Sequence, residues 1–137
     1  MSMLSTAGRV MSWICQLVAA GILAQTLYFK FTGAPESRYI FSTLGMEPWG
    51  RIGTGALEVV AVVLLLLPRT AALGALLAAG LMGGAILAHL TRLGIEIQGD
   101  GGLLFGLALA VLLVSLGVLV LRFRELPIVG RLLVASH

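Results

Sequence analysis

Four long apolar stretches run through this sequence and leave little chain outside them. They cover residues 10–31, 51–67, 70–90 and 101–121 of the 137 residues. About 20 apolar residues in a helix cross the roughly 30 Å of hydrocarbon in a bilayer, where a helix also satisfies its own backbone polar groups. The pattern predicts an all-α protein: a single membrane domain, an antiparallel bundle of four spans in contact with the lipid bilayer.

Composition and charge agree with this class. The chain is 59% hydrophobic and 11% charged, whereas soluble domains have about 45–50% apolar and about 25% charged residues. The formal charge of +3 comes from residues that flank the spans and gives no reason to expect nucleic-acid binding. The one cysteine, Cys15, excludes a CxxC redox pair within this chain.

The basic residues that flank the spans bear on orientation. Four spans place both ends of the chain on one side, with five basic residues there and four on the other side. This is a weak positive-inside bias, and we expect cytoplasmic termini. Residues 122–137 mix arginine with apolar residues and are expected to lie on the cytoplasmic surface as an amphipathic tail.

The connections predict which helices are neighbours. Pro68 and Arg69 alone join the second and third spans, with Thr70 placed to cap the next helix, so these two helices must be antiparallel neighbours. Residues 36–44, ended by Gly45, are predicted to form a short interfacial helix between spans 1 and 2. Its inward face would consist of Tyr39 or Ile40, Phe41 and Leu44.

Two glycine pairs have the GxxxG spacing. They are Gly80 with Gly84, and Gly102 with Gly106. Close contact between helices of the bundle is the simpler explanation, and a cleft for a flat ligand is the alternative.

Glu58 is the only ionisable residue in the apolar run 53–67. A charge at this depth costs about 2.5 kcal/mol or more on insertion scales, so it normally faces a bundle interior with a partner. Arg51 lies two turns earlier on the same face, about 10 Å away along the axis, and Lys30 ends the first span on the same side. Glu58 is therefore either a static ion pair with Lys30 or Arg51, or a functional carboxylate.

His89 and Asp100 also fall in this half of the membrane. His89 either donates a hydrogen bond to a carbonyl or to Glu58, or it binds a ligand or transfers a proton. Asp100 either caps the fourth helix or joins the site. The other half contributes only Cys15, Gln16 and Ser115 from within the spans. The candidate ligand-binding residues are Lys30, Arg51, Glu58, His89 and Asp100.

The cofactor options are narrow. No HxxxH or ExxH pair fixes a metal site, and His89 as the one histidine within a span excludes bis-histidine haem ligation inside one chain. Apolar walls with a few convergent polar groups suit a quinone or another small apolar molecule. Because Lys30, Arg51 and His89 can be cationic, the sequence favours an anionic or carbonyl-bearing head group.

Several short motifs occur in a recognisable order. They are Phe-Lys-Phe at 29–31, Gly-Thr-Gly-Ala-Leu-Glu at 53–58, Pro68, Ala-His at 88–89 and Gly-Asp-Gly-Gly at 99–102. In these motifs the chain resembles the DoxX-like family of small four-helix bacterial membrane proteins. The resemblance implies a multi-pass protein of the bacterial inner membrane. The family is similar to DoxD, a membrane subunit of thiosulfate:quinone oxidoreductase, but it offers no catalytic motif to carry over.

Three functions follow as hypotheses. The first is an accessory subunit of a membrane redox system that binds a quinone or small molecule and works with redox partner subunits. The second is a small proton-coupled transporter that uses Glu58, for which polar groups should line both halves of the bundle. The third is a structural assembly subunit. Homo-oligomers are compatible with all three, and the sequence leaves open whether the protein is an enzyme.

Overall fold

Four long helices form the framework of the protein. The structure, a computed structural model, describes residues 5–126. Its elements are α1 (Thr6–Thr32), α2 (Pro35–Thr43), α3 (Trp49–Leu66), α4 (Ala71–Ala88), the π-helical turn η1 (His89–Leu93), α5 (Leu103–Arg122) and the 3-10 turn η2 (Phe123–Glu125). The helices α1, α3, α4 with η1, and α5 are each long and apolar enough to cross a membrane. The predicted all-α bundle with four spans is confirmed, while the predicted amphipathic tail lies, from residue 127 on, outside the described residues.

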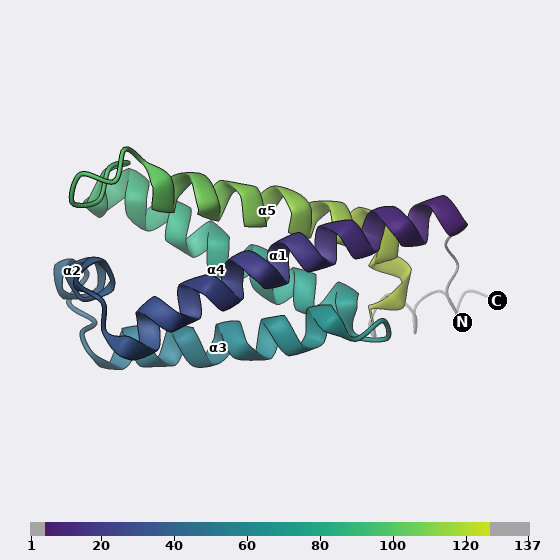
Figure 1. Ribbon diagram of the computed structural model, residues 1–137, viewed down its shortest axis with the longest axis horizontal. Helices are drawn as coiled ribbons and strands as arrows, with labels where there is room; N and C mark the ends of the chain where they lie inside the picture. Colours follow the sequence, from purple (N-terminus) through teal and green to yellow (C-terminus); the bar gives the residue numbers. More distant parts are fainter. Residues whose placement is uncertain (1–4, 127–137) are drawn as a thin grey trace.

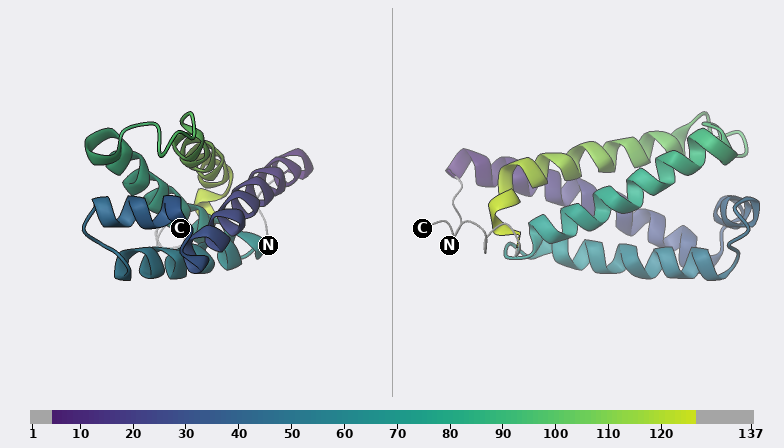
Figure 2. Two further views of the ribbon diagram at one scale, coloured as in Figure 1. Left: turned by 60° about the vertical axis from the view of Figure 1, so that its left-hand side comes forward. Right: turned by 180° about the vertical axis from the view of Figure 1, so that it is seen from behind.

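The four long helices pack as a ring. Helix α1 packs against α3 and α5, and α4 packs against the same two helices, so α1 and α4 lie diagonally opposite each other. Neighbouring helices run antiparallel (Figures 1 and 2). We call the end with the turn between α3 and α4 the Pro68 end, and the end with α2 and the loop 94–102 the α2 end.

Helix α2 lies across the α2 end and bridges two helix pairs. At this end α1 and α3 lie on one side and α4 and α5 on the other (Figure 1). Helix α2 contacts α1, α3 and η1, so it covers the end of the bundle as the sequence predicts. Of the two predicted alternatives for its inward face, Ile40 is correct and Tyr39 is not. Phe41 is buried, Ile40 and Leu44 are half-buried, and Tyr39 is exposed. Ser37 is also buried.

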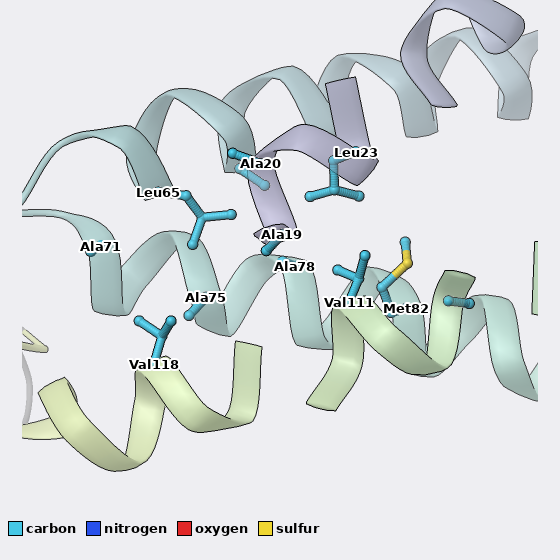
Figure 3. Close-up of a cluster of buried hydrophobic side chains, with 12 residues drawn as sticks. Ala19, Ala20, Leu23, Leu65, Ala71, Ala75, Ala78, Met82, Val111 and Val118 are labelled. Atoms are coloured by element: carbon cyan, nitrogen blue, oxygen red, sulfur yellow. The ribbon is translucent and has the colours of Figure 1, made fainter. Parts of the chain in front are cut away.

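The core of the bundle consists largely of small side chains. Its buried alanines are Ala19, Ala20, Ala61, Ala71, Ala72, Ala75, Ala78 and Ala108. A few larger side chains, among them Leu23, Leu65 and Val111, fill the space between the helices (Figure 3). The outer faces carry exposed leucine and valine, as expected of helices that contact lipid instead of water.

Helices α3 and α4 come into close contact at Gly74, which belongs to neither of the GxxxG pairs. A Cβ built on Gly74 would lie 2.7 Å from the Leu65 backbone nitrogen, so only glycine fits between α3 and α4 there. At Gly80, Gly84 and Gly106 a Cβ would meet nothing within 4 Å. The prediction that the GxxxG pairs bring helices of this bundle together is therefore wrong, because these glycines face outward.

The turn between α3 and α4 differs from its prediction in one bond. Thr70 does precede α4, but it makes no side-chain capping hydrogen bond. Its hydroxyl donates to the Leu64 carbonyl at 3.0 Å. The hydroxyl therefore ties the turn back to α3.

Substituting Gly74 by alanine should destabilise the bundle, because the added methyl group meets backbone atoms that cannot move aside. We expect a loss of about 1–3 kcal/mol, as for other overpacked cores, measured by unfolding in detergent. The control is Gly84→Ala on the same helix, which meets open space and should leave stability unchanged or slightly higher. Equal effects of the two substitutions would contradict this packing.

Cysteine labelling tests how the bundle crosses the membrane. In a Cys15→Ser background, single cysteines at the exposed positions Ser42, Gln98 and Arg69 should react with a membrane-impermeant reagent from different sides. Ser42 and Gln98 lie at the α2 end and should react from outside the cell, whereas Arg69 should be protected until the membrane is opened. Labelling of all three from one side would refute the topology.

Candidate functional site

A buried ion pair joins α1 and α3 in the half of the bundle nearer the α2 end. Glu58 lies close to the midpoint of α3 and is 1% exposed. Its Oε1 is 3.1 Å from Nζ of Lys30. Thr26 lies one turn before Lys30, and its hydroxyl is 3.3 Å from Glu58 Oε2 and 2.9 Å from the Leu23 carbonyl, so its single proton serves one of two acceptors.

The direction of the side chains explains why these residues meet. Side chains on a helix lean toward the N-terminus of that helix. Because α1 and α3 are antiparallel, Lys30 leans from the α2 end into the bundle, while Glu58 leans toward the α2 end. Lys30 is therefore largely buried and does not extend toward the head groups.

Arg51 is buried on the same face of α3 but pairs with another carboxylate. Its Nε lies 3.0 and 3.1 Å from the two carboxylate oxygens of Glu47, and Nη2 is 2.9 Å from Oε1. Its Nη1 donates to the backbone carbonyl of Lys30. Lys30 and Arg51 thus each have an acidic partner, which balances the positive charge that these two residues would otherwise offer to an anionic head group.

His89 lies in the π-helical turn η1 and is 4% exposed. Its Nδ1 is 2.9 Å from the Gly94 carbonyl oxygen, and the Gly94 N–H donates back to the His89 carbonyl at 2.7 Å. Since a carbonyl can only accept, Nδ1 must carry the proton. The ring also meets Phe105 of α5 edge to face, with centroids 5.5 Å apart. Single π-turns of this kind are frequent at functional sites.

Two helix pairs therefore hold the polar groups of the α2 end. Lys30 and Glu58 meet on the α1–α3 pair, and Arg51 joins them through the Lys30 carbonyl. His89 belongs to the α4–α5 pair, and its ring bonds to the Gly94 carbonyl, one of the two simple alternatives left open by the sequence. Helix α2 contacts elements of both pairs.

Asp100 lies two residues before Gly102, the N-cap of α5, so it is not the N-cap itself, but its carboxylate bonds to the loop and the first turn of that helix. Its Oδ1 accepts from the N–H groups of Ile97 at 3.0 Å and Gly102 at 2.8 Å, and Oδ2 accepts from Leu104 at 3.1 Å. Desolvation raises the pKa of Asp100, but the backbone donors outweigh it and hold the pKa below its ordinary 3.8. Its carboxylate thus fixes the loop before α5. Across residues 5–126, no cluster of three or more His, Cys, Asp or Glu could hold a metal ion.

A second buried polar cluster occupies the Pro68 end. Arg122, 3% exposed, donates from Nε to Ser12 Oγ at 2.6 Å. Ser12 donates to Gln16 Oε1 at 2.6 Å, and Gln16 Nε2 donates to the Leu65 carbonyl at 2.7 Å. This chain of bonds connects α5, α1 and α3. Sequence reasoning placed Arg122 in the flank, although the spacing of Ser12 and Gln16 by one turn was a visible signal.

Removal of the Asp100 carboxylate should destabilise the protein in a pH-dependent way. We expect Asp100→Ala to lose about 1 kcal/mol at neutral pH, as for other lost caps. Because the folded pKa is depressed, this contribution is complete above the ordinary pKa of 3.8 and is lost as the pH falls through the folded pKa. The stability difference from the unchanged protein should therefore narrow in acid.

The matched control for this prediction is Glu96→Gln. Glu96 is an exposed residue of the same loop whose carboxylate lies 3.4 Å from the Gly101 nitrogen. We expect little change in stability at any pH. A stability difference for Asp100→Ala that stays constant from pH 7 to acid would contradict the role of the charge.

Comparison with known proteins identifies the family. The sequence model of the DoxX-like family matches residues 14–118, well over half of the chain, and this range includes the five candidate residues from Lys30 to Asp100. Comparisons with curated proteins and with solved structures give no match. The matched region runs through all four spans, and the chain belongs to the DoxX-like family.

Proposed function

We propose that this protein is an accessory subunit of a membrane redox system and binds a quinone, or a molecule of similar size and polarity, at its α2 end. The observation that carries the proposal is the ion pair between Lys30 and Glu58, 3.1 Å apart with Glu58 1% exposed. Ionisable groups at such depth usually mark a functional site.

Stability alone explains this pair poorly. Burying two charges carries a desolvation penalty that their attraction often fails to exceed, and apolar residues of similar volume can be as stable. The rest of this core shows that the chain can fill the space between helices with alanine and leucine. A ligand that uses the polar groups gives a reason for their presence.

The arrangement favours a neutral head group. Glu58 balances Lys30, and Glu47 balances Arg51, so neither cation attracts an anion strongly. A lysine ammonium has three donors, and Lys30 can keep its bond to Glu58 while it donates to a ligand oxygen. The ring of Phe31 adds an apolar surface nearby, because its Cζ would lie 3.0 Å from a Cβ on Gly55, one turn from Glu58.

The family supports the redox setting. The resemblance to a membrane subunit of thiosulfate:quinone oxidoreductase supports a role in which a partner subunit carries the redox cofactor. The present chain would then supply the membrane site for the quinone. Because its charges are paired, a quinone is a better fit to this chain than a sulfur anion.

A proton-coupled transporter is the second candidate. The cluster of Arg122, Ser12 and Gln16 favours it, because polar groups now occupy both halves of the bundle. The layer between the two clusters, however, contains the almost fully buried apolar side chains Leu23 and Ala61. Transport would require this layer to open, whereas ligand binding at the α2 end would not.

Neutralising the ion pair separates ligand binding from static pairing. Lys30→Met should weaken the binding of a short-chain ubiquinone at least about tenfold, because it removes the charged donor to the ligand oxygen. It should also lower stability, since Glu58 keeps a buried charge without its partner. The double variant Lys30→Met with Glu58→Leu removes both charges and should regain stability while binding stays weak. Titration and thermal unfolding of the purified protein measure both quantities.

The control is Glu96→Gln, which changes an exposed carboxylate at the same end and should alter neither binding nor stability. Binding that survives in the stable double variant would contradict the proposal. If the double variant loses stability but binds the quinone as before, the ion pair serves only to hold α1 against α3. Uptake of a lipophilic cation into proteoliposomes that depends on a pH gradient and on Glu58 would support the transporter instead.

A further inference from the structure

Gln25 is a polar residue of α1 that faces outward inside the membrane. The hydroxyl of its neighbour Thr26 is 3.3 Å from the carboxylate of Glu58, close to the midpoint of the span α3, so Gln25 lies well within the bilayer. Helix α1 continues for about 10 Å beyond it to Thr32. The Gln25 side chain is exposed, and it makes no hydrogen bond or ion pair with any residue from 5 to 126. An amide without a partner costs free energy in lipid, so its position calls for an explanation.

The other long helices carry no such group on their outer faces. From Ile52 to Leu67, along α4 and along α5, every exposed residue is glycine, alanine or a larger apolar residue. These surfaces suit lipid chains. Gln25 therefore marks α1 as the helix that meets a polar partner within the membrane.

Gln25 belongs to a regular row of exposed residues on α1. The row advances by steps of three and four residues in alternation, the heptad spacing with which two helices pack along each other in a left-handed pair. Its members are Met11, Ile14, Val18, Gly21, Gln25, Tyr28 and Thr32, all exposed. We call this row the outer α1 face. At about 100° per residue it lies opposite the face that places Gln16, Ala19 and Leu23 in the core.

We propose that a second copy of this chain docks on the outer α1 face, and that the two Gln25 side chains hydrogen-bond to each other across a twofold axis. Copies inserted in the same orientation have parallel α1 helices. In a parallel heptad pair related by a twofold axis, each residue of the row meets its own counterpart. Gln25 therefore meets Gln25 at the same depth. The inference does not depend on the proposed function.

The chemistry of the outer α1 face suits an identical partner. An amide both donates and accepts, so two glutamines can satisfy each other, and the row contains no charged residue that would repel its counterpart. Gly21 lies one turn from Gln25, and a Cβ built on it would meet nothing within 4 Å. A partner helix can therefore approach closely there. A different protein would need a polar group of its own at the depth of Gln25, whereas a second copy brings one by symmetry.

Dilution with lipid measures the association. Copies labelled with a donor or an acceptor dye at Ser42→Cys, in a Cys15→Ser background, are reconstituted together in liposomes, and energy transfer is followed as lipid is added. We expect dimers, and a dissociation constant about tenfold higher for Gln25→Leu, the effect of one interhelical hydrogen bond. Gln25→Asn keeps an amide and should retain most of the association.

A second pair of variants tests the packing. Gly21→Ile adds volume where the two helices would meet and should weaken the dimer at least as much as Gln25→Leu. Its matched control is Gly84→Ile, which also adds a side chain to open space on an exposed face, but on α4. The control should associate like the unchanged protein. All four variants change exposed residues, so their thermal stability in detergent should stay close to that of the unchanged protein.

Disulfide cross-linking locates the contact. In a Cys15→Ser background, single cysteines at Ile14, Val18 or Tyr28 should each form disulfides between copies in membranes treated with an oxidant. Cysteines at Leu87 of α4 and Leu113 of α5, which are exposed as well, should not. These proteins keep Gln25, so cross-linking decides even if a variant at Gln25 fails to fold.

Three results would overturn the proposal. The first is an unchanged protein that stays monomeric in liposomes at every ratio of protein to lipid. The second is a dimer that Gln25→Leu and Gly21→Ile leave as stable as before. The third is cross-linking at Leu87 or Leu113 without cross-linking on the outer α1 face, because the contact would then lie on another helix.

Discussion

The absence of water from the hydrocarbon core governs this structure, because polar groups there depend on partners within the protein. Among the described residues, Ser115 Oγ is the buried side-chain atom that lacks one. The pairing of α1 with α3 meets this constraint at two depths. Lys30 and Thr26 of α1 contact Glu58, and Gln16 of α1 donates to the Leu65 carbonyl of α3. These bonds fix how α1 is positioned along α3, since a shift by one turn would break both sets together. The other helices then pack against this pair through small side chains.

Much of the fold follows from one-dimensional features of the sequence. The length of the apolar runs, the Pro68 turn and Gly45 predict the spans and the short helix α2, because helix length and chain breaks are local properties. The isolated charge of Glu58 likewise marks the site. The sequence does not decide between Lys30 and Arg51 as the partner of Glu58, because the helical repeat gives the face on which a residue lies but not its neighbour on the next helix.

The parts that could not be predicted depend on contacts between distant segments. Arg122 ends an apolar helix, where an arginine that reaches the head groups and one that turns inward look the same in sequence. Its bond to Ser12 joins residues 110 positions apart. The GxxxG pairs show the same limit: spacing places two glycines on one face of a helix, but only the packed bundle shows that this face points outward.

The alanine-rich core has a consequence for how the protein tolerates change. In cores built from leucine and phenylalanine, a typical damaging mutation removes atoms and leaves a void. Here residues such as Ala19, Ala61 and Ala75 have almost no side chain to lose and lie fully buried. Most substitutions on the inner faces can only add volume and push helices apart. Sequence drift should therefore be freest on the lipid-facing surface, and steric crowding will be the main cause of misfolded variants.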